Sequence, residues 1–373
     1  MRYGEAGQSH LLPFLGAAAL FAALTITAHS LVLGLAAVIA GPVPAAQTAL
    51  SLSRKAVSGA AQEEAASVAE AAPESTGTAA SQPEAAAPTG GIESYLVELL
   101  GDDARPEGAG AVIEKNYPQG SGEKYVACGT GSIKNNTRQT AADIAAEIQE
   151  PLPFGVEKDS PDPQILIMHT HASEAFTPAG RDLYPASDTC RTEDTNYNIV
   201  HVGDVLADTL EAAGLQVLHD RTIYDYPSYT GSYSRSGAAV QEYLNQYPSL
   251  RIVIDLHRDA LCSDSVVYKT VAELPDAACS QVMLLVGTNA SGLYHPYWEE
   301  NLRLAVYLQD AVNTAHPTLM RPITLVNERY NQHLTRGSLI IEVGSSGNTL
   351  QEATRAVRLF GESAGPALAR LVQ

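Results

Sequence analysis

The sequence predicts an α/β protein in which a three-layer, mainly parallel sheet follows a transmembrane helix and a disordered linker. One observation predicts the sheet. Short apolar runs of strand length alternate with longer amphipathic segments over the second half of the chain, and strands that alternate with helices form parallel sheets with helices on both faces. A second observation, a sharp change of composition near residue 111, separates this folded part from what precedes it.

The first 40 residues predict a membrane anchor. Residues 1–10 are a short polar start, which we expect to be a cytoplasmic tail, and residues 11–40 contain no Asp, Glu, Lys or Arg over 30 positions. A helix of that length spans about 45 Å, more than the roughly 30 Å hydrocarbon core of a bilayer. A secretory signal has an apolar core of only about 7–15 residues. We therefore expect an uncleaved transmembrane helix that places the rest of the chain outside the cytoplasm.

Residues 41–110 predict a disordered tether. They are rich in Ala, Glu, Pro, Gly and Ser, and residues 57–110 hold ten acidic side chains against one basic one, Arg105. Such a composition buries too little apolar surface to offset the entropy of ordering the chain. The whole chain has a net charge of −19, which argues against nucleic-acid binding, because phosphate recognition needs a basic surface.

Folded sequence resumes at residue 111 with a predicted lead-in segment, 111–160. It contains a strand and turn over 133–137 and a short helix after Thr140, whose apolar positions are Ile144, Ala145 and Ile148. The catalytic domain is predicted to span 161–373. Its expected strands cover 165–168, 215–218, 252–256, 282–286 and 339–343, and its expected helices cover 199–213, 237–246, 298–313 and 349 to the end. A polar loop over 176–195 and an aromatic loop over 226–233 complete it.

The four cysteines do not indicate a particular metal site or disulfide pairing. Cys128, Cys190, Cys262 and Cys279 form no C-x-x-C pair, so a structural zinc knuckle is not expected. A Cys262–Cys279 bridge outside the cytoplasm and free buried thiols both remain open.

Three of the predicted strands end on side chains that bind metals. His171 and Glu174 follow the first strand in an H-x-x-E spacing, His257 ends the strand at 252–256, and Glu342 lies in the strand at 339–343. The carboxyl ends of the strands of an open α/β sheet meet at one crevice. Two imidazoles and one carboxylate, with a fourth position open for water, make a catalytic zinc set. Glu342 would then be the base that takes the proton of the water.

Two further side chains belong to this hypothesis. His169 precedes His171 by two residues, so it is either an alternative zinc ligand or a group that orients one. Asp255 precedes His257 by two residues and is expected to accept a hydrogen bond from a ligand. Arg258, next to His257, binds substrate or pairs with Asp259.

The motifs resemble those of the stage II sporulation protein P family of endospore-forming bacteria. The resemblance covers roughly residue 131 to the C-terminus. It depends on HTHxxE at 169–174, NIVxVGD at 198–204, YxGSYxRS at 229–236, DxHRDA at 255–260, RYNQH at 329–333 and IEVG at 341–344 followed by Asn348-Thr349. An N-terminal anchor followed by a poorly ordered linker is also the arrangement of that family.

The resemblance implies a zinc-dependent N-acetylmuramoyl-L-alanine amidase with a fold like that of zinc amidases and exopeptidases. In the wider group of amidases, the two zinc histidines match His171 and His257 and the catalytic glutamate matches Glu342. Glu174 is the better match for the carboxylate ligand, and Glu193 is a lesser candidate. The cofactor implied is Zn²⁺. The side chains expected to contact peptide or sugar are Arg258, Arg235, Tyr229, Asn331 and Gln332.

The implied substrate is peptidoglycan, in septal thinning and engulfment during sporulation. The implied partners are a lytic transglycosylase of the stage II sporulation protein D type and other engulfment proteins of the membrane. Two alternatives stay open: a zinc endopeptidase or carboxypeptidase acting on stem peptides, which suits the same ligand spacing, and a non-catalytic scaffold that binds the wall.

Overall fold

The computed structural model describes residues 110–180, 183–184, 188–263, 266–275 and 277–371. The predicted tail and transmembrane helix, and the linker up to residue 109, lie outside these ranges and stay predictions. Within the described ranges, no helix is both long enough and apolar enough to cross a membrane.

The centre of the fold is a mixed sheet, which confirms the predicted α/β class. In the described part of the chain this sheet has eight strands in the order β2-β3-β11-β10-β12-β7-β4-β6. The neighbours pair in parallel except for β2–β3 and β10–β12. The bounds are β2 Tyr125–Cys128, β3 Gly131–Asn135, β4 Ile165–Met168, β6 Val217–His219, β7 Ile252–Asp259, β10 Val282–Gly287, β11 Ile323–Val326 and β12 Gly337–Ser345.

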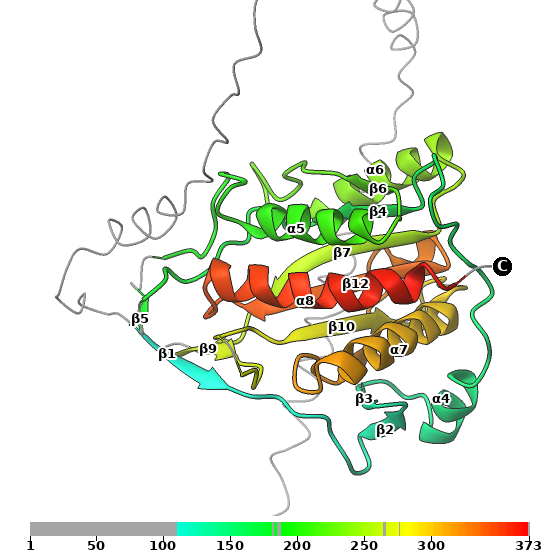
Figure 1. Cartoon of the computed structure of the whole chain (residues 1–373), viewed down its shortest axis with the longest axis horizontal. Coiled ribbons are helices and arrows are strands. Elements are labelled where there is room, and N and C mark those ends of the chain that lie inside the picture. The colour runs from blue at the N-terminus through cyan, green and yellow to red at the C-terminus, as the bar shows by residue number, and fades with distance from the viewer. Residues whose placement is uncertain (1–109, 181–182, 185–187, 264–265, 276, 372–373) are drawn as a thin grey trace, which may run out of the picture. The chain divides into compact units, whose positions relative to one another are not determined.

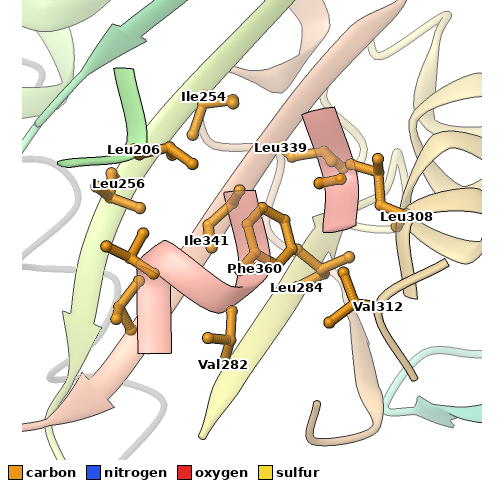
Figure 2. Packing of buried hydrophobic residues seen from close by; sticks show 14 of the residues in the cluster. Leu206, Ile254, Leu256, Val282, Leu284, Leu308, Val312, Leu339, Ile341 and Phe360 are labelled. Atoms are coloured by element: carbon orange, nitrogen blue, oxygen red, sulfur yellow. The ribbon is translucent and has the colours of Figure 1, made fainter. Parts of the chain in front are cut away.

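Three helices cover one face of this sheet. These are α5 (Ile199–Ala212), α7 (Trp298–Ala315) and α8 (Leu350–Leu368), with α8 lying between the other two (Figure 1). Alternate strand residues enter the core beneath them, among them Ile254, Leu284 and Ile341 around Phe360 of α8 (Figure 2). Burying such a side chain stabilises the fold by roughly 1.5–3 kcal/mol, so this layer supplies much of the stability.

The opposite face of the sheet packs against α6 (Ser232–Gln246). Leu166 and Met168 of β4, Val253 of β7 and Val240 of α6 form a second, smaller apolar cluster there. Helices on both faces make the three layers that the alternating pattern predicted. A 3₁₀ turn, η1 (Gln332–Leu334), lies beside α6 on this face.

The lead-in segment is part of the main sheet and not a separate piece. Its strand β3 pairs in parallel with β11, and β2 pairs with β3. The predicted lead-in and the predicted catalytic segment therefore share one sheet: the strand expected at 133–137 is β3, whereas β2, at the edge of the sheet, was not predicted. Helix α4 (Ala141–Glu147) begins as predicted, with Thr140 as its N-cap.

A second sheet was not predicted at all. Its order is β5-β1-β9-β8, with bounds Gly110–Lys115 for β1, Leu183–Tyr184 for β5, Cys262–Ser263 for β8 and Val266–Thr270 for β9. The four cysteines are free, so the structure contains no Cys262–Cys279 bridge.

Candidate active site

Strand alternation puts His257 and Asp255 on the side of the sheet that α6 covers. On β7, Ile254 and Leu256 enter the core beneath α5 and α8. Successive side chains of a strand point to opposite faces. Asp255 and His257 therefore point away from that core, and both are buried.

Glu342 reaches the same place from the next strand. Its neighbours Ile341 and Val343 belong to the core, so Glu342 points to the α6 side. In the parallel register of β12 and β7, Glu342 lies directly opposite His257. A carboxylate and an imidazole thus lie side by side on one face.

His171 and Glu174 come from a tight turn after β4. The strand ends at Met168, and the N–H of Glu174 donates to the carbonyl of His171 at 3.1 Å. This turn places Glu174 Oε2 3.5 Å from His257 Nδ1, and the rings of His171 and His257 lie 5.4 Å apart, centre to centre. The structure therefore brings together the three predicted zinc ligands; their role as ligands stays a prediction.

His257 lies between two carboxylates. Asp255 Oδ1 is 2.7 Å from its Nε2, and Glu174 is on the Nδ1 side. Burial would lower the pKa of His257, but Asp255 and Glu174 raise it well above its ordinary value. Burial would likewise raise the pKa of Glu174, but His257 and Arg258 lower it to about 2. Both side chains are therefore charged, and they stabilise each other.

Glu342 differs from the other two carboxylates. Its Oε2 is buried and has no hydrogen-bond partner among the described residues. Burial raises the pKa of Glu342 to about 8, whereas a cation nearby would favour the ionised form. The unpaired oxygen of Glu342 lies in register beside His257, so Glu342 is placed to accept a proton once a cation ionises it.

A chain of hydrogen bonds holds Asp255. Its two oxygens accept from the backbone N–H (2.8 Å) and the hydroxyl (2.7 Å) of Thr170. The Thr170 hydroxyl lies 2.8 Å from that of Ser236 in α6, to which Asn331 Nδ2 donates at 3.1 Å. The predicted role of Asp255, to orient His257, agrees with this arrangement.

His169 lies outside the cluster. Its Nδ1 is 2.9 Å from the carbonyl of Leu256 and its Nε2 is 2.8 Å from Nε2 of His219. Both ring nitrogens are thus engaged on the α5 side, where Gly203 of α5 lies close to them. The expectation that His169 and His171 share a face was wrong, because β4 ends at Met168 and the chain turns between the two. His171 is the histidine that faces His257.

Four of the five predicted substrate contacts bind this chain's own groups instead. Arg258 donates to the carbonyls of Ala175 (2.6 Å) and Cys190 (2.9 Å) and is buried; its neighbour Asp259 pairs with Arg321 at 2.8 Å. Arg258 thus fixes the loop that follows Glu174, and we do not propose it as a substrate contact.

The other three side chains also support loops. Arg235 donates to the carbonyls of Tyr224 and Thr230. Gln332 uses both ends of its amide on the backbone of β10, at 2.7 and 2.8 Å, and Asn331 donates to Tyr233 O and Ser236. These positions hold α6 and the aromatic loop in place around the site.

Tyr229 is a predicted contact that stacks directly on a predicted zinc ligand. It is 57% exposed, yet its ring stacks on His171 with centres 4.4 Å apart and planes within 8°. Arg191 also lies over this ring, with Cζ 5.0 Å from the ring centre. Tyr229 therefore covers His171 at the mouth of the site.

The pattern of the sequence missed Arg191 and Tyr233. Arg191 pairs with Asp225 at 2.7 Å and approaches Glu174 at 3.9 Å, and Tyr233 meets His171 edge-on at 5.4 Å. Glu193, the lesser candidate for a carboxylate ligand, is exposed on the same loop as Arg191. Contacts across 17 or more positions leave no local signal, so only the fold reveals them.

His171, Glu174 and His257 are side chains of the types that bind zinc, but their atoms do not already lie in the positions of a zinc coordination sphere. In the described ranges no three His, Cys, Asp or Glu side chains have metal-binding geometry as they stand, because His257 points both nitrogens at carboxylates. Two imidazoles with a carboxylate are ligands that zinc prefers. The carboxyl groups of Glu174, Asp255 and Glu342 surround the single charged imidazole of His257, and Oε2 of Glu342 is unpaired. This excess of carboxyl groups favours the binding of a further positive charge.

Fold and site together define a class: an α/β protein with a buried cluster of histidines and carboxylates on one face of a mainly parallel sheet. A sequence model of the family described as "Stage II sporulation protein P (SpoIIP)" matches residues 109–363. The chain belongs to this family. A curated relative, stage II sporulation protein P of Bacillus subtilis (strain 168), is 27% identical over 203 residues, or 52% of this chain. The match covers 48% of that relative, so the chain spans about half its length.

Among solved structures, the chain is similar to three N-acetylmuramoyl-L-alanine amidases. AmiC2 of Nostoc punctiforme is 13% identical with a TM-score of 0.32, over 55% of this chain and 94% of that one. The enzyme of Clostridium difficile 630 is 14% identical with a TM-score of 0.31, over 57% and 95%. Ami1 of Mycobacterium abscessus is 11% identical with a TM-score of 0.32, over 55% and 97%. TM-scores this low do not establish a common fold.

Proposed function

We propose that this chain is a peptidoglycan hydrolase of sporulation that cleaves the amide between N-acetylmuramic acid and L-alanine. The observation that carries the proposal is the position of Glu342, in register beside His257 and with an unpaired buried oxygen. Family membership supports the link to sporulation, and the motifs of the sequence support the amidase chemistry.

Each side chain of the site has its own role in the proposed reaction. His171, Glu174 and His257 would hold a zinc ion, which when bound would polarise carbonyl groups and make water more acidic. Glu342 Oε2 accepts the proton of the attacking water and passes it to the leaving nitrogen. Asp255 keeps His257 in orientation through the Thr170 contacts. Tyr229 excludes water from the outer face of the His171 ring.

The proposal extends to the setting of the enzyme. The apolar segment 11–40 anchors the chain in the membrane and residues 41–110 tether the hydrolase outside it. A tether raises the local concentration of an enzyme at a nearby polymer without any new contact. The proposed partners are a lytic transglycosylase of the stage II sporulation protein D type and other engulfment proteins of the membrane. The transglycosylase, which cuts the glycan strand, complements a cut in the peptide branch.

The test is digestion of purified peptidoglycan by the full chain, with and without a zinc chelator. We expect soluble stem peptides that begin with a free L-alanine amino group, as identified by mass, and none after chelation. Glu342→Gln should retain zinc and lose activity by about 10²–10⁴-fold, the usual contribution of a general base.

The matched control is Glu193→Gln, which removes an exposed carboxylate and should leave cleavage unchanged. Full activity in Glu342→Gln would refute the assignment of the base. Fragments cut between two amino acids, with L-alanine still on the sugar, would replace the amidase with an endopeptidase.

A further inference from the structure

Three basic side chains form a second cluster outside the catalytic site. His295 lies in the loop between β10 and α7, Arg329 lies in the loop after β11, and His333 lies in η1. The rings of His295 and His333 are 6.5 Å apart and nearly perpendicular. Arg329 Nη1 donates to the carbonyl of Tyr294 at 3.1 Å, which ties the first loop to the second.

This cluster has nitrogen atoms with nothing to bind. Both ring nitrogens of His295, Nδ1 of His333 and Nε of Arg329 are buried and have no hydrogen-bond partner among the described residues. His295 is only 2% exposed. A buried polar group without a partner costs about 1–3 kcal/mol, and such a group in a folded protein calls for a ligand, an ion or water.

The charges around His295 favour an anion. Burial, together with the nearby His333 and Arg329, lowers the pKa of His295 to about 4. Both side chains that shift this pKa are basic. A guanidinium beside two imidazoles repels a metal ion, whereas it matches the two oxygens of a carboxylate.

The cluster lies within reach of the catalytic site. Tyr330, the neighbour of Arg329 in the chain, lies with its ring 5.4 Å from that of Tyr233, and the Tyr233 ring lies 5.4 Å from that of His171. A tetrapeptide in extended conformation spans about 13 Å, so one end can lie at His171 while the other lies near Arg329.

We propose that His295, Arg329 and His333 form a subsite for the C-terminal carboxylate of the stem peptide, whose L-alanine end lies at the catalytic cluster. This inference rests on the proposed function. Arg329 and His333 are partly exposed, so the carboxylate enters from their side. Leu293 and Tyr294, 53% and 76% exposed in the same loop as His295, lie against the apolar side chains of the peptide.

The test compares two ligands that differ in one group. The peptide L-alanyl-γ-D-glutamyl-L-lysyl-D-alanine and its C-terminal amide are titrated calorimetrically into the full chain. We expect the amide to bind about 10- to 100-fold more weakly, since hydrogen bonds between charged groups contribute about 1.5–3 kcal/mol. Equal affinities of the acid and the amide peptide would overturn the proposal. If inorganic phosphate binds the cluster while the two peptides bind equally well, the cluster is an anion site that does not bind the peptide.

Variants locate the effect. Arg329→Gln and His295→Asn should abolish the difference between acid and amide, whereas His316→Asn, a histidine at the end of α7, should keep it. If His295→Asn does not fold, Arg329→Gln and the comparison in the unaltered protein decide. If the chain prefers the acid peptide but does not cleave peptidoglycan, the proposed function is refuted and the subsite stands. If it cleaves peptidoglycan without preferring the acid peptide, the proposed function stands and the subsite is refuted.

Discussion

Tyr229 is an exposed side chain that stacks on a predicted zinc ligand. Its ring centre lies 4.4 Å from that of His171 and 5.0 Å from Cζ of Arg191. We expect Tyr229→Ala to free the His171 ring and to weaken zinc binding by about 10–100-fold, the usual effect of losing a group that orients a ligand. Competition with a coloured chelator measures the zinc affinity.

Tyr229→Phe is the matched control, because it keeps the ring and removes only the hydroxyl. It should bind zinc as the unaltered chain does. If Tyr229→Ala left the zinc affinity unchanged and raised only KM, Tyr229 would be a substrate contact, as the sequence predicted, and not a support for His171.

At the scale of single residues, the sequence predicts side chains that follow apolar runs. His171, His257 and Glu342 could be placed together because each lies at a recognisable strand end. Arg258 could not be assigned correctly, because an arginine that binds substrate and one that binds backbone carbonyls look the same in a sequence.

Among the elements, α5 and α8 pack closely, and two glycines of α8, Gly361 and Gly365, allow it. A Cβ on Gly361 of α8 would lie 1.9 Å from Oγ1 and 2.8 Å from Cβ of Thr209 in α5. We therefore expect Gly361→Ala to lower the free energy of unfolding by about 1–3 kcal/mol, as overpacking does, despite the better helix propensity of alanine. Chemical denaturation measures the change.

The neighbouring exposed residue supplies the control. Glu362→Ala adds no atom to the interface and should change the free energy of unfolding by less than about 0.5 kcal/mol, as surface substitutions do. A Gly361→Ala variant as stable as the unaltered chain would show that α5 and α8 separate at little cost.

Local signals predict helix ends when a cap carries them. Thr349 and Glu352 form a capping box at the start of α8, as the pattern indicated. Helix α6 starts at Ser232, five residues before its predicted start, because Gly231 with φ 84° turns the chain into the helix. Its first turn is polar and faces the site, so no apolar period marks it.

For the whole molecule, alternation of strands and helices predicted the layers and the mainly parallel pairing, but not which strand pairs are antiparallel. The antiparallel pairing of β10 with β12 and the small second sheet depend on contacts between distant segments. The same long-range contacts decide whether the candidate site is one site at all. His171 and His257 are 86 positions apart in the sequence, and only the β4–β7 pairing brings them together.

Because the predicted ligands belong to different segments, zinc should stabilise the whole fold and not only the site. A ligand at about 100 times its Kd contributes about 2.7 kcal/mol, and in a protein of this size each kcal/mol raises the melting temperature by about 2–4 °C. We expect zinc to raise the melting temperature by roughly 5–10 °C and magnesium, which prefers an octahedron of oxygen ligands, to have little effect. His257→Asn should lose the response to zinc. An equal response in His257→Asn would place the zinc elsewhere, and the cluster of histidines and carboxylates would then need another explanation for its unpaired Glu342 oxygen.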